Sequence, residues 1–205
     1  MSWQEQNIAV YNEAASGLSN YFRATEPRII DINLGLNLAG YQADVVTEAR
    51  VVEIGCGDGR DAEEIVKRAP SYKGFDPSVG MLDIARTRLP GVSFVEADAL
   101  SYDYPEDTDI VFALASLYHT EQKDMGTVFD RVAESLRQGG IFYVALKERD
   151  EYTEEVKTDR FGERMFCYYN PGILSKIAER LLKTEHVGRQ KMGNTDWFTQ
   201  AFTKV

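Results

Sequence analysis

The sequence has few of the residues from which disulfide frameworks and metal sites are built. It contains two cysteines, Cys56 and Cys167, and two histidines, His119 and His186, among 205 residues. Two distant cysteines predict no disulfide scaffold, and two histidines cannot form a metal centre by themselves. We therefore predict no metal site, and we expect Cys56 to be a small packed side chain rather than a reactive thiol.

The sequence also lacks the features of membrane and nucleic-acid-binding proteins. No apolar run approaches the ~20 residues that span a bilayer, and the polar N-terminus is unlike a signal peptide. The formal net charge of −10 argues against the basic surface that binding to phosphates requires. We expect a cytoplasmic protein without a membrane or nucleic-acid partner.

Repeats, low-complexity tracts and a recognisable linker are missing as well. The 205 residues suffice for one α/β domain with a substantial core and are few for two. We predict a single domain over residues 1–205.

The most informative stretch is a short apolar run followed by closely spaced glycines. Residues 51–54 are mainly β-branched and read as a buried strand, and 62–68 have helical spacing. Gly55, Gly57 and Gly59 lie between them at alternate positions. Glycine permits unusual backbone conformations and a close approach by a ligand, and the helix start adds unpaired N–H groups. This pattern favours a ligand-binding turn, with a plain tight turn as the alternative.

The spacing of these glycines discriminates between nucleotide ligands. A dinucleotide loop needs G-x-G-x-x-G, and Arg60 stands where the third glycine would be. The arrangement of an acid followed by three alternate glycines resembles the nucleoside-binding motif of class I S-adenosylmethionine-dependent methyltransferases. The resemblance extends with motifs from about residue 51 to 146, and it implies S-adenosyl-L-methionine as the cofactor. In this loop it implies cofactor contacts at Glu53, Gly55, Cys56, Gly57 and Gly59.

Two acids further along the chain fit an adenosine ligand. Asp76 ends a strand predicted at 72–76, where such ligands have their ribose hydroxyls held. NAD would use the same acid, so Asp76 does not separate the two cofactors. Asp98 follows a third strand at 92–97, and the resemblance implies that it accepts from the adenine amine, whereas a simple turn residue is the alternative. The other predicted cofactor contacts are Pro77, Met81, Ala99, Leu100, Ala113 and Leu114.

The predicted acceptor side follows the apolar strand at 109–115. An exocyclic-amine methyltransferase of the nucleic-acid type would carry Asn/Asp-Pro-Pro-aromatic here. This chain has Ala-Ser-Leu-Tyr at 115–118, which speaks against adenine N6 methylation. We predict Tyr118 as a substrate contact. His119 is a candidate general base or substrate contact, and a structural helix cap is the alternative.

Two further segments are candidates for covering the site. Residues 1–41 are expected to form an N-terminal helical cap, from which Tyr11 and Tyr21 reach the substrate unless both are core aromatics. Residues 147–169 are charged and then aromatic, and we interpret them as a substrate lid. The candidate substrate contacts in the lid are Arg164 and Tyr169, and Tyr168 is a candidate catalytic residue.

Strands expected at 141–146, 184–190 and 197–202 complete the pattern. The chain is predicted to form a three-layer α/β, Rossmann-like methyltransferase fold with a seven-stranded, mostly parallel sheet and an antiparallel last strand. The function that the sequence favours is methyl transfer from S-adenosyl-L-methionine to a small molecule, by a monomer or homodimer. An NAD(P)-dependent oxidoreductase and a non-catalytic S-adenosylmethionine-binding protein are the alternatives.

Overall fold

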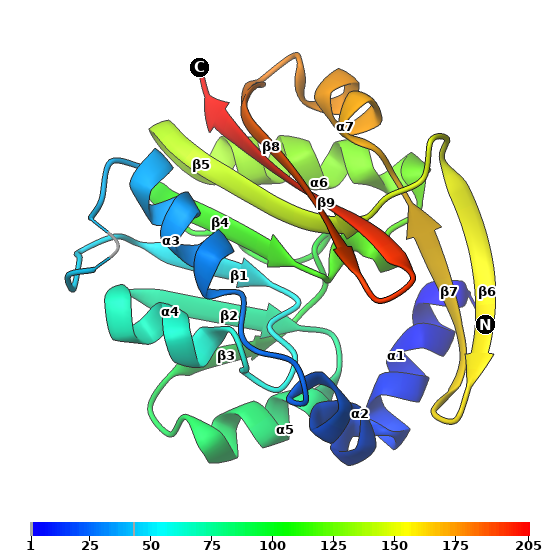
Figure 1. The fold of residues 1–205 in the computed structure, drawn as a ribbon. Coiled ribbons are helices and arrows are strands. Elements are labelled where there is room, and N and C mark those ends of the chain that lie inside the picture. Colours follow the sequence, from blue (N-terminus) through cyan, green and yellow to red (C-terminus); the bar gives the residue numbers. More distant parts are fainter. Residues whose placement is uncertain (1, 43) are drawn as a thin grey trace.

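A seven-stranded β-sheet runs through the centre of the computed structural model, which describes residues 2–42 and 44–205 (Figure 1). In spatial order the strands are β3 (Ser93–Glu96), β2 (Tyr72–Asp76), β1 (Val51–Ile54), β4 (Thr108–Leu114), β5 (Leu136–Lys147), β9 (Thr195–Lys204) and β8 (Leu182–Met192). β1 and β4 are buried along their whole length, as apolar strands in the middle of a covered parallel sheet should be.

The strand directions agree with the prediction. β3, β2, β1, β4 and β5 pair in parallel, whereas β9 is antiparallel to both of its neighbours, β5 and β8. The reversal arises because β8 and β9 form a hairpin, which turns at Gly193 with a φ of 61°. The predicted seven-stranded, mostly parallel sheet with an antiparallel last strand is confirmed.

β5 begins earlier than predicted. Helix α6 (Gln122–Ser135) leads directly into the strand, so Gly139 and Gly140 lie within β5 and not in a turn before it. The pairing of β5 with β4 shifts register in this stretch, and Gly139 has a φ of 71°. The two glycines therefore accommodate an irregularity in the strand, which the sequence alone made look like a loop.

Helices cover both faces of the sheet and complete the predicted three layers (Figure 1). α3 (Ile29–Leu38), α4 (Ala62–Arg68) and α5 (Val79–Arg88) share one core with the sheet. α6 and α7 (Pro171–Ala178) share the core on the opposite face.

The N-terminal cap is shorter than predicted, because its third helix belongs to the core. α1 (Trp3–Glu13) and α2 (Ala15–Phe22) pack beside α5, but α3 packs on the sheet. Ile32 and Leu36, one turn apart, are fully buried there. The ring of Phe112 approaches so closely that a Cβ on Gly35 would lie 2.5 Å from it. The apolar face of α3 is thus used for the core and not for covering a ligand.

The predicted lid is a β-hairpin of β6 (Thr153–Asp159) and β7 (Gly162–Tyr168), separate from the main sheet. β7 packs against α1 (Figure 1). There the Asn7 side chain accepts a hydrogen bond from the backbone N–H of Met165 (3.0 Å) and donates one to its carbonyl (3.1 Å). The first helix is therefore tied to a hairpin that follows it by more than half the chain.

No helix in residues 2–42 and 44–205 combines the length and the apolar character needed to cross a bilayer.

Candidate active site

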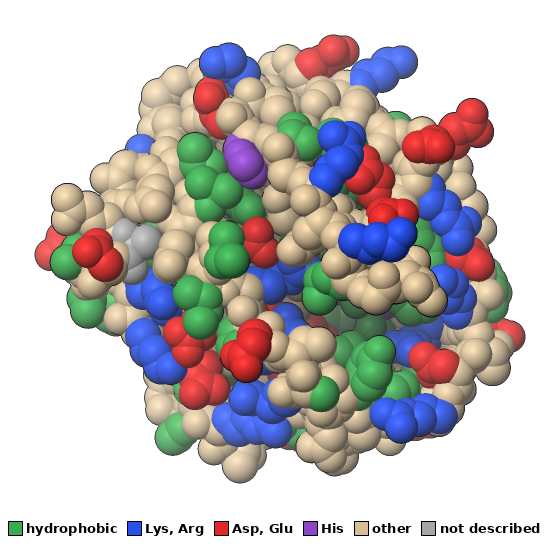
Figure 2. Space-filling view, viewed as in Figure 1, with side chains coloured by type: hydrophobic (Ala, Val, Ile, Leu, Met, Phe, Trp, Pro, Cys, Tyr) green, Lys and Arg blue, Asp and Glu red, His purple; other side chains and the backbone are tan. Residues whose placement is uncertain are grey.

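A cavity of about 850 Å³ lies at the carboxyl ends of β1, β2, β4 and β5. Its walls come from the glycine loop after β1, the acids after β2 and β3, the segment after β4, and helices α1 and α2. The tip of the β8–β9 hairpin closes another side, and the surface is hollowed between this tip and α2 (Figure 2). Open α/β sheets bind ligands at this edge, and the volume suits a small molecule.

Gly55 and Gly57 give the cavity a floor of bare main chain. Both have positive φ, 67° and 55°, which other residues adopt only with strain. A Cβ on Gly55 would lie 2.3 Å from the Cβ of Ser116, whose hydroxyl donates to the carbonyl of Ile54 at 2.7 Å. The loop after β4 is therefore packed directly onto the glycine loop, and no side chain at Gly55 could fit between them.

Glu53 is a buried acid at the end of β1. Its carboxylate accepts a hydrogen bond of 2.5 Å from the hydroxyl of Tyr72. Burial raises the pKa of Glu53 to about 8, and the nearby carboxylate of Asp61 contributes to the rise. Among the described residues no lysine or arginine forms an ion pair with Glu53. A positively charged ligand group would therefore stabilise the ionised carboxylate.

Asp76 and Asp98 are held by backbone N–H groups. Asp76 accepts from Gly57 (3.0 Å) and Ser78 (2.8 Å), which fixes the end of β2 to the glycine loop. Burial raises the pKa of Asp76 to about 6, although these hydrogen bonds oppose the rise. One oxygen of Asp98 accepts from Leu100 and Ser101, and its other oxygen lies 3.4 Å from Gln4 Nε2. Asp98 is thus a turn residue that also lines the cavity.

The Cys56 side chain is buried within the glycine loop. Burial, together with the charges of Asp76 and Glu53, raises the pKa of its thiol well above the usual value. The thiol is neutral at physiological pH, as expected for a packed side chain and not for a nucleophile.

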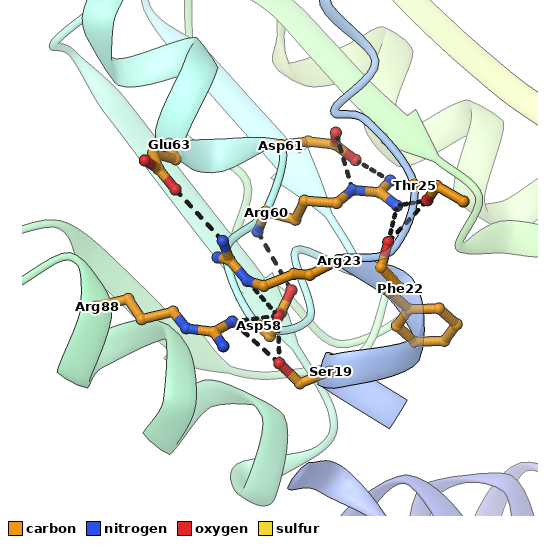
Figure 3. Close-up of polar contacts among 9 residues, drawn as sticks. All are labelled: Ser19, Phe22, Arg23, Thr25, Asp58, Arg60, Asp61, Glu63 and Arg88. Carbon is orange, nitrogen blue, oxygen red and sulfur yellow. Dashed lines mark hydrogen bonds and ion pairs between the residues drawn. The ribbon is translucent and has the colours of Figure 1, made fainter. Parts of the chain in front are cut away.

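A cluster of polar contacts joins the glycine loop to α2 (Figure 3). The buried carboxylate of Asp58 accepts from Ser19 Oγ (2.5 Å) and Arg23 Nε (2.8 Å) of α2, and also from Arg88 of α5. Burial would raise the pKa of Asp58, but the hydrogen bonds from Ser19 and Arg23 hold it below its usual value. We call Ser19, Arg23, Asp58 and Arg88 the Asp58 clamp.

Arg60 adds a second connection between the same segments. It pairs with Asp61 (2.7 Å) and donates to the carbonyl of Phe22 (3.3 Å) and the hydroxyl of Thr25 (3.1 Å) (Figure 3). The loop that forms the cavity floor and the helix that forms one wall are therefore a connected unit.

His119 lies at the opposite wall, beside Tyr11 and Tyr118. Its Nδ1 is 2.7 Å from the carbonyl of Met165, so the proton lies on Nδ1 and Nε2 accepts from the Tyr11 hydroxyl at 3.0 Å. Burial lowers the pKa of His119 to about 3, so the ring is neutral at physiological pH. Both ring nitrogens are occupied, which makes His119 an internal hydrogen-bond partner and not a base open to the cavity.

Most of the residues predicted from the sequence line this one cavity. They are Tyr11, Tyr21, Glu53, Gly55, Cys56, Gly57, Asp76, Pro77, Met81, Asp98, Ala99, Leu100, Leu114, Tyr118 and His119.

The other predicted residues lie outside the cavity lining. Gly59 turns the loop toward α5, where a Cβ would lie 3.3 Å from Ala85. Ala113 is buried in the core between the sheet and α6, because it points to the other face of β4. The cavity lining therefore does not support the predicted cofactor contacts at Gly59 and Ala113.

The lid residues also lie away from the cavity. Arg164 pairs with Asp159 within the hairpin. Tyr168 is buried with its ring 3.9 Å from the Arg149 guanidinium carbon, and the buried hydroxyl of Tyr169 donates to the carbonyl of Thr120 at 2.7 Å. These aromatic side chains form the core between the hairpin and its neighbours. None of Arg164, Tyr168 and Tyr169 is in the cavity lining, so the structure gives no support to the predicted substrate contacts or to the predicted lid.

Several lining residues escaped the sequence reasoning. Lys147 ends β5 beside the predicted strand at 141–146, so its place at the binding edge was a usable signal. Arg28, Met192 and Trp197 reach the cavity from segments far away in sequence, and no local pattern marks them.

The fold and the site together define a class. A seven-stranded sheet with one antiparallel strand, a glycine loop after β1 and acids at the ends of β2 and β3 are the features of class I S-adenosylmethionine-dependent methyltransferases. Residues 51–140 match the family model described as a methyltransferase domain. This match spans less than half of the 205 residues, so it makes residues 51–140 similar to methyltransferase domains.

Similar proteins with assigned names match about half of the chain. One is the trans-aconitate 2-methyltransferase of Rhizobium leguminosarum bv. trifolii, which is 39% identical over 101 residues, covering 48% of this chain and 39% of the relative. The chain thus matches about two fifths of the length of that relative.

Similarity to solved structures extends over nearly the whole chain. The 1,6-didemethyltoxoflavin-N1-methyltransferase of Burkholderia thailandensis has a TM-score of 0.70 at 16% identity, with 100% of this chain and 91% of that chain covered. An S-adenosylmethionine-dependent methyltransferase of Clostridium acetobutylicum has a TM-score of 0.71 at 15% identity, covering 95% and 98%. At such identities the similarity establishes the fold.

Proposed function

We propose that this protein transfers a methyl group from S-adenosyl-L-methionine to a small-molecule acceptor. One observation carries the proposal: a single cavity of about 850 Å³ joins the glycine loop, Asp76 and Asp98 to the polar groups of Tyr11, Tyr118 and Lys147. A cavity with a nucleoside-type end and a separate polar end can hold a cofactor and an acceptor together, which is the main requirement of methyl transfer.

The residues present fit this cofactor. The bare backbone at Gly57 leaves room for a ligand to lie against the loop, whereas Gly55 makes room for Ser116. Glu53 forms no ion pair among the described residues, and the ligand's ammonium group could provide one. Asp76 would accept from the ribose hydroxyls, and the Asp98 oxygen that faces Gln4 would accept from the adenine amine. When bound, the cofactor supplies a methyl group already activated on a sulfonium.

The acceptor end orients groups and excludes water. The N–H of His119 donates to Met165, which fixes the ring so that Nε2 holds the hydroxyl of Tyr11. Tyr11 can take a proton from an acceptor only by passing its own proton to Nε2 of His119. An acceptor whose reacting atom is already deprotonated needs no such step.

The relatives named trans-aconitate 2-methyltransferase make trans-aconitate the first acceptor to test. The nicotinamide alternative is weaker, because Arg60 replaces the third glycine. Tyr143 and Lys147 do have the Tyr-x-x-x-Lys spacing of some nicotinamide enzymes, but the Tyr143 hydroxyl is bound to Asp31 at 2.7 Å, outside the cavity lining.

A ligand titration and a transfer assay test the proposal. S-adenosylhomocysteine at 100 times its dissociation constant should stabilise the protein by about 2.7 kcal/mol, which raises the melting temperature by roughly 5–10 °C. NAD and NADP should leave the melting temperature unchanged. Labelled methyl from S-adenosyl-L-methionine should then appear in an acceptor. Binding without transfer to any acceptor would favour the non-catalytic alternative, and stabilisation by NAD would favour the oxidoreductase.

The remaining expectations are part of the same proposal. We propose that residues 1–205 act as one methyltransferase domain, in the cytoplasm, as a monomer or homodimer without a nucleic-acid partner. The net charge of −10 supports the last point, and light scattering of the purified protein would measure the oligomeric state.

A further inference from the structure

Lys147 is the last residue of β5 and brings an ammonium group into the cavity wall. Its Nζ lies 3.8 Å from the ring centre of Phe166, 4.7 Å from that of Tyr118 and 5.9 Å from that of Trp197. Ring faces attract a cation but accept no strong hydrogen bond. The aromatic side chains therefore hold the ammonium in place and leave its N–H groups available.

Lys147 differs from the other cations of the cavity wall in having no acidic partner. Arg28 pairs with Asp31 at 3.1 Å, and Arg60 pairs with Asp61 at 2.7 Å. In the part of the chain that the structure describes, no carboxylate lies within ion-pair distance of Lys147. A half-buried ammonium without a counter-ion is unfavourable unless a ligand supplies one.

The charges around Lys147 do not compensate it. Lys157 and Arg164 disfavour its charged form, and Glu155 and Asp159 oppose this effect only in part. The acids in the same region are already paired, Glu155 with Arg149 and Lys157, and Asp159 with Arg164. Burial together with these cations lowers the pKa of Lys147 to about 8, so at neutral pH it is still mostly protonated. The acids near Lys147 are thus shared with other cations, and in the described part of the chain none of them forms a direct ion pair with its ammonium group.

The two ends of the cavity carry opposite charges, which indicates where a cationic and an anionic ligand group would lie. Glu53 and Asp76 lie at the glycine loop, where a cationic cofactor fits, and Lys147 lies on β5 beyond Tyr118. We propose that Lys147 determines acceptor specificity by binding a carboxylate group of the methyl acceptor. One uncompensated cation matches a singly charged carboxylate better than a doubly charged phosphate. The inference rests on the proposed methyl transfer.

Two variants separate recognition from proton transfer. Lys147→Met removes the charge and keeps much of the length, whereas Lys147→Arg keeps a charge that cannot act as a base at neutral pH. Lys183→Met is the matched control, because Lys183 lies on β8 outside the cavity lining and pairs with Glu185. S-adenosylhomocysteine affinity, measured by calorimetry, should agree within about twofold among all variants and establishes that each is folded.

The assay uses labelled S-adenosyl-L-methionine and a small-molecule extract of the source cells, separated at pH 7 into fractions retained and not retained by an anion exchanger. The acceptor should be in the retained fraction. Lys147→Met should lower kcat/KM for this acceptor by about 10- to 100-fold, through KM, as expected for loss of a hydrogen bond to a charged group. Lys147→Arg should stay within about fivefold of the wild type.

Three results would overturn the inference: an acceptor found only in the unretained fraction, an unchanged KM in Lys147→Met, or an equal loss of kcat in both Lys147 variants, which would make Lys147 a base. Failure of the wild type to bind S-adenosylhomocysteine is a different result. That result would contradict the proposed methyl transfer itself, and the inference about Lys147 would fall with it.

Discussion

Glu53 is a titratable residue of the proposed cofactor site, and its ionisation should respond to a bound cation. Its buried carboxyl has a pKa of about 8, with the hydroxyl of Tyr72 as its hydrogen-bond donor. Below pH 8 the group is mostly neutral, so binding a cation next to it requires the release of a proton. Cofactor affinity should therefore depend on pH in a range where most carboxyl groups do not titrate.

Calorimetric titration with S-adenosyl-L-methionine should give an affinity that rises as the pH increases from 6 to 7.5, by up to about tenfold per pH unit, while the ammonium group of the ligand is still mostly protonated. The sign follows because the bound cation favours the ionised carboxylate, whose formation is complete only above the pKa. Glu53→Gln keeps the shape and an oxygen for Tyr72 but cannot ionise, so its affinity should be lower and nearly independent of pH. An equal slope in both proteins would contradict this role.

Gly55 offers a second test at the residue scale. Gly55→Ala places a methyl group 2.3 Å from the Cβ of Ser116 at a φ of 67°, so the loop must shift. We expect a loss of roughly 1–3 kcal/mol in unfolding free energy and at least tenfold weaker binding of S-adenosylhomocysteine.

The control for this change lies on α6. A Cβ on Gly126 would meet nothing within 4 Å, and the position is inside a helix. Gly126→Ala should raise stability by about 0.5–1 kcal/mol in urea unfolding and leave cofactor affinity unchanged. If Gly55→Ala bound S-adenosylhomocysteine as tightly as Gly126→Ala, binding would not depend on the close packing of the glycine loop.

At the scale of elements, the Asp58 clamp connects three segments that are separate in sequence. α2, the glycine loop and α5 meet at one buried carboxylate, and the arginines that surround it come from two different helices (Figure 3). Each of these arginines is partly exposed, so solvent screens the attraction somewhat. The clamp should nevertheless stabilise α2 against the loop, because its central acid is only 3% exposed.

Asp58→Ala should lower the unfolding free energy by about 2–3 kcal/mol and weaken S-adenosylhomocysteine binding, since it leaves Arg23 and Arg88 without their shared partner. Glu63→Ala removes a looser and more exposed contact of the same Arg23, 3.5 Å long, and should cost less than about 0.5 kcal/mol. Chemical denaturation of the two variants measures the difference. If both variants lost the same unfolding free energy, the buried Asp58 clamp would stabilise the protein no more than the exposed Arg23–Glu63 pair does.

At the scale of the whole molecule, the cavity depends on contacts between distant parts of the chain. Tyr11 from α1 meets His119 from the segment after β4, and His119 in turn binds the carbonyl of Met165 on β7. Asn7 bridges both backbone groups of the same Met165. The β6–β7 hairpin, which was expected to cover the site, instead holds α1 through the contacts between Met165 and Asn7.

Asn7→Ala should therefore loosen the cavity wall that α1 and β7 share. It leaves the buried N–H and carbonyl of Met165 without the Asn7 amide, which costs about 1–3 kcal/mol. Hydrogen exchange should become faster in α1 and β7 and stay unchanged in β1 and β4. Gln6→Ala, at the neighbouring position with a 3.3 Å contact to the carbonyl of Glu163, should have little effect on either. Unchanged exchange in Asn7→Ala would contradict this support.

The sequence was sufficient to predict the residues at the carboxyl ends of β1, β2 and β3, because local backbone patterns mark these residues. The glycine loop, Glu53, Asp76 and Asp98 are each marked by a strand end next to a turn, and the parallel sheet brings such ends to one edge. The seven strands and the antiparallel last strand were expected from the C-terminal hairpin pattern together with the family resemblance, whereas the order of the strands came from the structure.

The tertiary structure alone decided which side chains form the acceptor end. Tyr168 and Tyr169 look like ligand contacts in sequence but are packed inward, because a hairpin between two elements must bury its aromatic side chains. Lys147 and Trp197 meet across β5 and β9, a pairing that no local pattern contains. The sequence by itself predicted the glycine loop and the acids that line one end of the cavity, since backbone conformation is local, whereas the side chains at the other end are brought together by long-range packing and could be identified only from the fold.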